Sequence, residues 1–267
     1  MVPFNLRLLN TIKAKRSLLC VGLDMHPDLF YPQTASLDTL KKHAEKVIDA
    51  TKELAVAYKP NLAFFERWGS KGFKWLEELV RQLKSDSIVI GDAKRGDIGS
   101  TAKQYAFSLF SHFNFDAVTL NPFLGSDSIT PFSTNPEKGV FLLCKTSNRS
   151  ANEIQTLETP EGKIFEVIAK LAVQLNHNQN IGLVVGATVP REIETVRKWA
   201  PDLPLLIPGI GHQGGNLEKV IKAGYRGGSA LINISRSISF AGDLSKAAIH
   251  STALDYVLKM RRFIDES

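Results

Sequence analysis

Cysteine is nearly missing from this chain of 267 residues, which contains only Cys20 and Cys144. No CxxC pair and no cluster of Cys with His occurs, so the sequence predicts neither a disulfide framework nor a zinc site. Both cysteines fall inside apolar runs, where we expect them to be buried strand residues. A chain of this length can bury enough apolar surface to fold without such crosslinks.

Long apolar runs are missing as well. The opening segment MVPFNLRLLN lacks the extended apolar core of a signal peptide. No run reaches the roughly 18 apolar residues that a membrane-spanning helix needs. We therefore expect a cytoplasmic protein that does not associate with a membrane.

Clusters of like charge are also absent, although the chain is basic, with a formal net charge of +6 and a pI near 9.2. No five or six consecutive residues carry the same charge, and aromatic residues do not alternate with basic ones as they do on base-stacking surfaces. The basic balance favours an anionic ligand, and the missing basic clusters predict that this ligand is not a nucleic acid. A non-catalytic protein that binds nucleotides or RNA remains an alternative, suggested by the pI alone.

Short apolar runs, in contrast, recur along the whole chain. They are nearly continuous rather than alternating, which is typical of strands covered on both faces in a parallel sheet. The eight runs are residues 18–23, 55–60, 87–92, 116–120, 139–144, 181–187, 203–209 and 229–234.

Amphipathic stretches separate most of these runs and predict helices, with Pro190 and Asn216 as helix starts and Gly224 as a helix end. Alternating strands and helices over about 250 residues predict a (β/α)₈ barrel that occupies residues 1–267 as one domain. An open doubly wound sheet is the alternative, but its glycine-rich fingerprint is missing after the first strand. The predicted helices are residues 37–54, 71–84, 163–176, 190–199 and 215–223.

Charged residues follow the predicted strands, and the segment DAKRGD (92–97) is the densest example. On an extended strand Asp92 and Lys94 project to the same side, with Asp97 nearby and Lys59 across the barrel mouth. Because strand ends meet at the mouth of a barrel, these charges would keep Lys94 protonated and oriented. Arg95 would point the other way, which favours a structural ion pair. Asp24 also ends a strand, but a single residue of this kind is more typical of a turn.

Two glycine- and serine-containing segments follow the seventh and eighth strands, PGIGHQGGN and SRSIS. Barrels commonly bind phosphate at this position through backbone N–H groups and helix N-termini. Gln213 and Arg236 could add hydrogen bonds, since a guanidinium can contact two phosphate oxygens at once. The sequence therefore predicts a phosphate site beside the charged strand ends.

These motifs together resemble the orotidine 5′-phosphate decarboxylase family over nearly the whole chain. DAKRGDIGST fits the family's Asp-x-Lys-x-x-Asp-Ile-x-x-Thr signature, and NPFLG, KTSN and PGIGHQGG are similar to its second, bacterial subfamily. The resemblance implies a (β/α)₈ barrel that converts orotidine 5′-phosphate to UMP and CO₂ without a metal or organic cofactor. It also implies a homodimer whose active sites lie at the subunit interface. Asn121, in NPFLG, stands where the first subfamily commonly has another residue.

The resemblance assigns the charged network of the family to Lys59, Asp92, Lys94 and Asp97. It implies that Asp97 and Thr101 reach into the site of the neighbouring subunit. Lys94 would stabilise and then protonate a carbanion at C6 of the pyrimidine ring.

The remaining roles concern substrate binding. By resemblance, Asp24 binds the ribose hydroxyls, Ser147 contacts the pyrimidine ring and Pro208 lies against the base. Gln213 and Arg236 match the phosphate ligands of the family.

Related sugar-phosphate enzymes such as hexulose-phosphate synthase resemble the chain in the same Asp-x-Lys-x-x-Asp pattern. These enzymes use Mg²⁺ held by carboxylates at strand ends. Lys59 would place a cation beside such a metal, which favours the decarboxylase.

Overall fold

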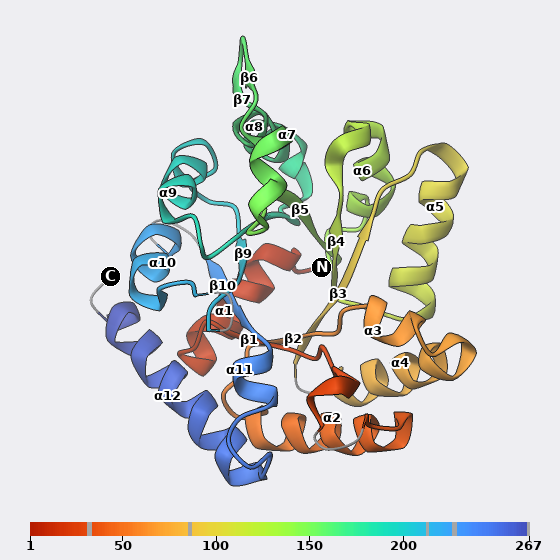
Figure 1. The fold of residues 1–267 in the computed structure, drawn as a ribbon. Helices are drawn as coiled ribbons and strands as arrows, with labels where there is room; N and C mark the ends of the chain where they lie inside the picture. Colours follow the sequence, from red (N-terminus) through yellow and green to blue (C-terminus); the bar gives the residue numbers. More distant parts are fainter. Residues whose placement is uncertain (31–33, 85–86, 212–213, 226–228, 266–267) are drawn as a thin grey trace.

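A closed barrel of eight parallel strands forms the centre of the computed structural model (Figure 1). The structure describes residues 1–267 except 31–33, 85–86, 212–213, 226–228 and 266–267. Each predicted apolar run overlaps one barrel strand, and β3 and β5 extend past their runs, so the (β/α)₈ prediction is confirmed and the open-sheet alternative is wrong. The barrel strands are β1 (Leu19–Gly22), β2 (Ala57–Lys59), β3 (Ile88–Arg95), β4 (Ala117–Leu120), β5 (Gly139–Lys145), β8 (Ile181–Val185), β9 (Leu205–Pro208) and β10 (Ala230–Ile234).

Burial on both faces explains why these strands read as continuous apolar runs. Every residue of β1, β4, β8 and β10 is buried, because one face packs inside the barrel and the other packs against the surrounding helices. Cys20 and Cys144 are free and buried, as expected.

The predicted helices all form and surround the barrel, with ends that differ from the prediction by a few residues. Ser36 and Asn216 cap two of them by accepting a hydrogen bond from a backbone N–H of the first turn. Pro190 is the first residue of another. These helices are α2 (Leu37–Thr51), α4 (Gly69–Leu83), α8 (Ile164–Leu175), α9 (Pro190–Trp199) and α10 (Leu217–Gly224).

Further helices, which the sequence analysis did not predict, complete the ring. Helix α1 lies behind the barrel in the view of Figure 1, and its Phe4 packs edge-on against Phe141 of β5. Helix α12 packs beside α2, so the two ends of the ring meet. The additional helices are α1 (Phe4–Lys15), α3 (Ala63–Glu66), α5 (Gly99–Phe107), α6 (Ser126–Ser133), α7 (Asn152–Gln155), α11 (Arg236–Ser239) and α12 (Lys246–Asp265).

A small hairpin, β6 (Glu158–Thr159) and β7 (Gly162–Lys163), projects beyond the ring next to α7 and α8 (Figure 1). Short helical turns occur in the loops. They are 3₁₀ turns at Pro27–Leu29, Pro122–Leu124, Arg149–Ala151 and Asn176–Asn178, and one π-helical turn at Ser108–His112.

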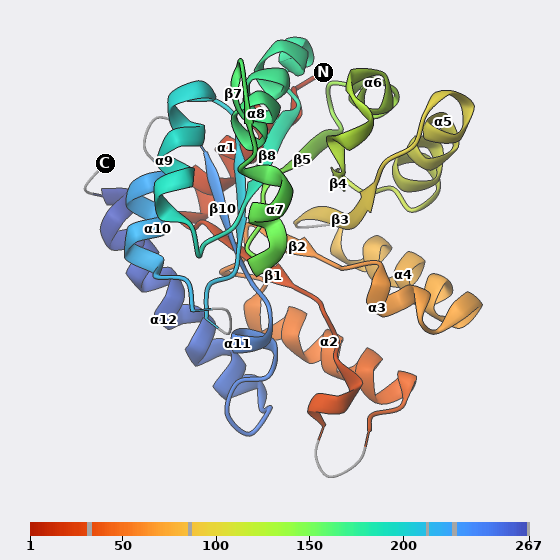
Figure 2. The same ribbon diagram turned by 45° about the horizontal axis from the view of Figure 1, so that its top comes forward.

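The two ends of the barrel differ in what covers them. Helix α1 covers the end where the strands begin, whereas the loops after the strands, with α7 and α11, surround the other end (Figure 2). The strand ends predicted to carry the chemistry therefore meet at this second end. Within the described residues, no helix combines the length and apolarity needed to cross a membrane.

Candidate active site

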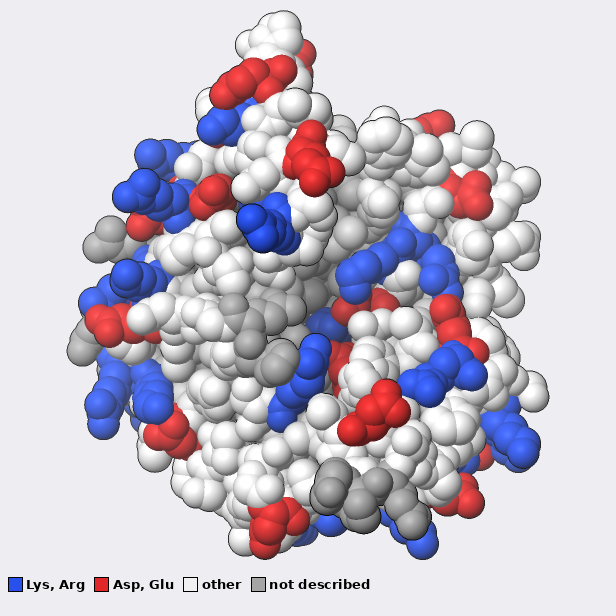
Figure 3. All heavy atoms as spheres, in the orientation of Figure 1, with Lys and Arg blue, Asp and Glu red and all other residues white. Residues whose placement is uncertain are grey.

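A cavity of about 1060 Å³ opens where the barrel strands end. Figure 3 shows this end of the molecule hollowed near its centre, with Lys and Arg side chains around the hollow. Residues from almost every strand end line the cavity, so the fold brings together groups that are far apart in the sequence. The predicted site residues on its wall are Asp24, Lys59, Asp92, Lys94, Asn121, Ser147, Pro208 and Arg236.

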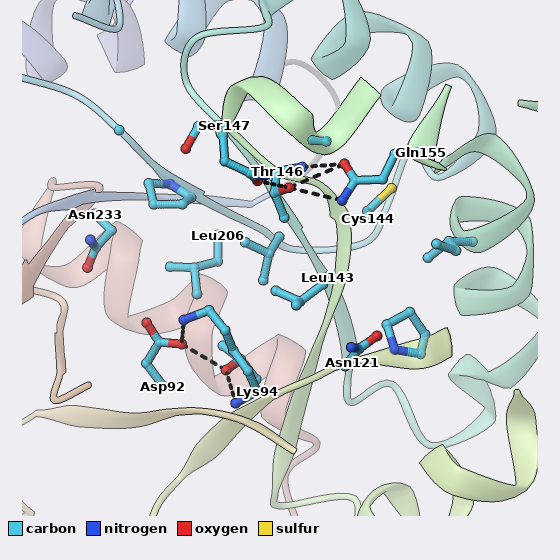
Figure 4. Close-up of a pocket in the computed structure, with 18 of the residues that line it drawn as sticks. Asp92, Lys94, Asn121, Leu143, Cys144, Thr146, Ser147, Gln155, Leu206 and Asn233 are labelled. Carbon is cyan, nitrogen blue, oxygen red and sulfur yellow. Dashed lines mark hydrogen bonds and ion pairs between the residues drawn. The ribbon is translucent and has the colours of Figure 1, made fainter. Parts of the chain in front are cut away.

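Two lysines hold one aspartate in this cavity, and Figure 4 shows one of them, Lys94, beside Asp92. Lys59 Nζ lies 2.6 Å from Asp92 Oδ2, and Lys94 Nζ lies 2.6 Å from Asp92 Oδ1. The side chains of Lys59 and Asp92 are 5% and 9% exposed, whereas that of Lys94 is 49% exposed. Lys59 therefore anchors the carboxylate, and Lys94 presents its ammonium group to the cavity.

The electrostatics of this array keep both buried partners ionised. Burial alone would raise the pKa of Asp92, but the charges of Lys59 and Lys94 outweigh it and hold the pKa well below its ordinary value. Burial alone would lower the pKa of Lys59, but Asp92 and Asp24 outweigh it and hold that pKa above its ordinary value. The array thus carries fixed charges at neutral pH.

The backbone of Lys94 differs from the extended strand that the sequence analysis assumed. Its φ is +47°, in the left-handed region that side chains other than glycine rarely adopt. The pairing of β3 with β4 shifts register between Gly91 and Arg95, as at a β-bulge. The predicted meeting of Asp92 and Lys94 is confirmed, but a local irregularity rather than strand alternation brings it about.

Thr119 on β4 is a site residue that the sequence analysis missed. Its hydroxyl donates to Asp92 Oδ1 at 3.0 Å and accepts the backbone N–H of Lys94 at 3.0 Å. In the sequence, Thr119 is one β-branched residue in the run DAVTL, so no pattern separates it from ordinary strand residues.

Arg95 and Asn121 have structural contacts next to the site. The guanidinium of Arg95 pairs with Glu66 and lies over the ring of Tyr105, as a structural role predicts. The side chain of Asn121 accepts from the backbone N–H of Phe123 and so caps the turn after β4, while the residue also lines the cavity.

Asp24 offers an unused acceptor to the cavity. Its Oδ1 is buried and has no hydrogen-bond partner among the described residues. A buried carboxylate oxygen without a partner is costly, so a ligand hydroxyl would satisfy it. The contact of Asp24 with a sugar hydroxyl stays a prediction.

Helix α11 positions Arg236 at its first residue, directly after β10. The helix is tied to β1, because the hydroxyls of Ser235 and Ser239 both donate to the carbonyl of Gly22. The loop after β9 approaches it at Gly211, whose φ is +83° and where an added Cβ would collide with the Ser237 hydroxyl. The two predicted phosphate-binding loops therefore meet; Gln213 lies outside the described residues.

The loop after β5 lies on the side of the cavity away from Asp92 and Lys94 (Figure 4). Gln155 of α7 accepts the backbone N–H of Thr146 and donates to its hydroxyl, both at 2.9 Å. These bonds fold the loop back on itself beside Ser147. Pro208, at the end of β9, lines the same cavity.

Asp97 and Thr101 are not brought to this cavity. Asp97 accepts the backbone N–H of Ile98 at 2.8 Å, and Thr101 lies on α5, where it lines a separate hollow of about 510 Å³. Large apolar side chains are exposed on α5 and in the neighbouring loops: Ile98 (55%), Phe107 (65%) and Phe123 (81%). Both residues therefore lie outside the cavity, on a segment that carries exposed apolar side chains.

The arrangement combines an oriented ammonium group, an unused carboxylate oxygen and a separate guanidinium. It can place an anionic ligand with Arg236 at one end and Lys94 at the other, and Lys94 can give a proton to a carbanion. Among the described residues, no three His, Cys, Asp or Glu side chains are grouped as metal ligands.

Comparison with known proteins supports this interpretation of the cavity. Residues 17–250 match the family described as "Orotidine 5'-phosphate decarboxylase / HUMPS family". A protein of Herpetosiphon aurantiacus named orotidine 5′-phosphate decarboxylase is 44% identical over 243 residues, which cover 88% of each chain. One of Haloarcula marismortui with the same name is 43% identical over 242 residues, covering 89% of this chain and 87% of that protein.

Solved structures agree with the sequence relatives. The OMP decarboxylase of Leishmania donovani superposes with a TM-score of 0.85 at 39% identity and covers 96% of this chain and 98% of its own. The UMP synthase of the same organism gives a TM-score of 0.89 at 41% identity and covers 98% of this chain, which spans only 57% of that longer protein.

Proposed function

Because the chain belongs to the orotidine 5′-phosphate decarboxylase / HUMPS family, we propose that it converts orotidine 5′-phosphate to UMP and CO₂, the last step of pyrimidine nucleotide synthesis. The observation that carries the proposal is the buried Lys59–Asp92 pair, which orients Lys94 in the cavity. Its assignment to the second subfamily stays a prediction.

Lys94 provides the chemistry in this proposal. Cleavage of the bond between C6 and the carboxylate releases CO₂ and leaves the electron pair on C6, where no ring carbonyl can delocalise it. The ammonium of Lys94 stabilises this developing charge and then donates its proton to C6, which gives UMP. The neutral amine regains a proton from solvent, so the cycle needs no metal or organic cofactor.

Asp92 orients Lys94 and also stands where the substrate carboxylate would lie. Two neighbouring anions would destabilise the bound substrate, but charge stabilisation by Lys94 ranks first, because it acts directly on the transition state.

Binding of the remote phosphate supports the reaction at the ring. Arg236, with Gln213, would hold the phosphate, Asp24 the ribose, and Ser147 and Pro208 the base. Asn121 lines the cavity and adds to the substrate wall. Phosphate binding energy would close the loops after β5 and β9 over the ring and exclude water.

A homodimer with shared sites is part of the proposal. Asp97 and Thr101 lie on a surface with exposed apolar side chains, which is typical of a protein interface. A second copy covering this surface would receive both residues at its own cavity. Residues 1–267 would then act as one domain per subunit. The two free, buried cysteines fit a reducing, cytoplasmic compartment.

The test follows the absorbance of orotidine 5′-phosphate with purified protein that has been treated with EDTA. We expect conversion to UMP at a rate unchanged by EDTA. No conversion, combined with metal-dependent turnover of a hexulose phosphate, would contradict the proposal. Salt-sensitive RNA binding without CO₂ release would instead support a nucleic-acid-binding protein.

A further inference from the structure

The hydroxyl of Thr119, on the neighbouring strand, connects the carboxylate of Asp92 to the backbone of Lys94. It accepts the backbone N–H of Lys94 and donates its single proton to Asp92 Oδ1, each at 3.0 Å. Thr119 is 1% exposed, so water does not compete for these bonds. A hydroxyl that accepts one bond and donates the other has its orientation fixed.

The hydrogen bond from the Lys94 N–H to Thr119 stabilises an unfavourable backbone conformation at Lys94. A residue with a φ of +47° is disfavoured unless its surroundings hold it in place. The register shift between Gly91 and Arg95 interrupts the ladder with β4, so the N–H of Lys94 bonds a side chain instead of a strand carbonyl. Thr119 therefore satisfies a backbone donor at the bulge, the N–H of Lys94.

We propose that Thr119 is a positioning residue for the decarboxylation, whose hydroxyl fixes the Lys94 backbone and the Asp92 carboxylate in one relative geometry. The inference rests on the proposed function and deepens it. Lys59 keeps the Asp92 carboxylate ionised through its contact with Oδ2, and Thr119 holds the carboxylate in position through its hydrogen bond to Oδ1. The Lys94 ammonium then points to a constant place in the cavity.

Two substitutions separate the hydroxyl from the shape of the side chain. Thr119→Val keeps the branched shape but removes both hydrogen bonds, whereas Thr119→Ser keeps the hydroxyl and removes a methyl group. The proposed phosphate and ribose contacts, Arg236 and Asp24, lie on other strand ends, so the hydroxyl should affect the chemical step more than binding.

The experiment measures kcat and KM for orotidine 5′-phosphate with both variants and the wild type. For Thr119→Val we expect kcat to fall on the order of 10- to 100-fold, with KM within about 3-fold of wild type. The acidic limb of its kcat profile should move to higher pH, since Asp92 loses a donor. Thr119→Ser should retain kcat within about 3-fold.

Thr51→Val is the matched control, because Thr51 is also fully buried and bonded through its hydroxyl, to Val47 O and to the Tyr58 hydroxyl, away from the cavity. It should lose stability while kcat stays normal. If Thr119→Val does not fold, Thr119→Cys replaces it, and its kcat should lie between those of wild type and Lys94→Ala.

A Thr119→Val enzyme with the kcat and pH profile of wild type would overturn the inference. Equal losses of kcat in Thr119→Ser and Thr119→Val would overturn it as well, because the hydroxyl would not be the determinant. A wild type without decarboxylase activity would instead contradict the proposed function, so the two failures can be told apart.

Discussion

Asp92 is the most constrained charge in the cavity, because two ammonium groups and one hydroxyl hold its carboxylate. The carboxylate has little freedom to turn, and its proton affinity is low. At the scale of single residues, the account therefore makes predictions about charge and stability.

The first concerns the pH dependence of stability. The folded-state pKa of Asp92 lies below its ordinary value of 3.8, so its stabilisation is present above that value and is lost as pH falls through the folded-state pKa. The difference in free energy of unfolding between wild type and Asp92→Asn should be constant from about pH 7 to pH 5 and narrow only under stronger acid. Urea denaturation across this range measures it; a difference that already shrinks near pH 6 would contradict the ionised array.

The second concerns the buried pair. Lys59→Met should lower the free energy of unfolding by about 3 kcal/mol or more, because Asp92 keeps its buried charge and loses its buried partner. Lys41→Met is the control, since Lys41 forms a more exposed pair with Glu78 at 3.7 Å and should cost about 1 kcal/mol or less. Equal, small losses in both variants would mean that the pair does not hold the carboxylate.

At the scale of elements, the sequence predicted the barrel strands well because each is buried on both faces. The helices at the two ends of the chain escaped prediction, although their buried residues follow helical spacing: Phe4, Leu8 and Ile12 in α1, and Ile249, Ala253, Val257 and Met260 in α12. That pattern was available in the sequence and could have been found.

Other features of the site could not be predicted from local sequence. The left-handed backbone of Lys94 is imposed by the register of two strands, and lysine has no intrinsic preference for it. The contact between Thr119 and Asp92 likewise depends on which strands are neighbours in the barrel. The residue types at the strand ends were predictable, but their exact geometry depends on tertiary contacts.

A residue of α2, His43, holds helix α11, which carries the proposed phosphate ligand Arg236. His43 Nε2 lies 2.6 Å from the carbonyl oxygen of Ser239, and its ring packs against Phe30 and Phe240. Burial lowers the pKa of His43, so the imidazole is held neutral. The contact between His43 and Ser239 fixes the short helix that begins with Arg236.

His43→Phe should therefore weaken UMP binding about 3- to 10-fold while uridine binding changes little, because the helix that carries Arg236 loses a hydrogen bond. His43→Gln can still donate to Ser239 and serves as the matched control. Arg236→Ala sets the upper limit of the effect. Calorimetric titration with UMP and uridine measures these affinities, and equal losses for both ligands would argue against a link to the phosphate.

At the scale of the whole molecule, one buried cluster of structural charges lies at the end of the barrel opposite the cavity. Asp116, directly before β4, is buried and bonds both Arg7 and Lys84 at the end that α1 covers. The cavity lies at the other end, and its apolar outer neighbours remain exposed in a single chain. This separation is typical of (β/α)₈ barrels.

Shared sites can be tested by mixing two inactive chains. In a dimer of Lys94→Ala with Asp97→Ala chains, one site would receive intact groups from both subunits. Random pairing makes about half the dimers mixed, each with one intact site, so about a quarter of wild-type activity should return. Mixing Lys94→Ala with Asp92→Ala is the control, because both residues belong to one subunit's site and no activity should return. Equal recovery in both mixtures, or none in either, would contradict sharing through Asp97.

The role of Lys94 is the central claim, and CO₂ release by Lys94→Ala tests it most directly. The variant should keep the unfolding transition of a folded barrel and still bind UMP, yet lose decarboxylation by several orders of magnitude, because neither charge stabilisation nor proton transfer remains. Turnover close to that of wild type, in a protein that binds UMP normally, would contradict the account.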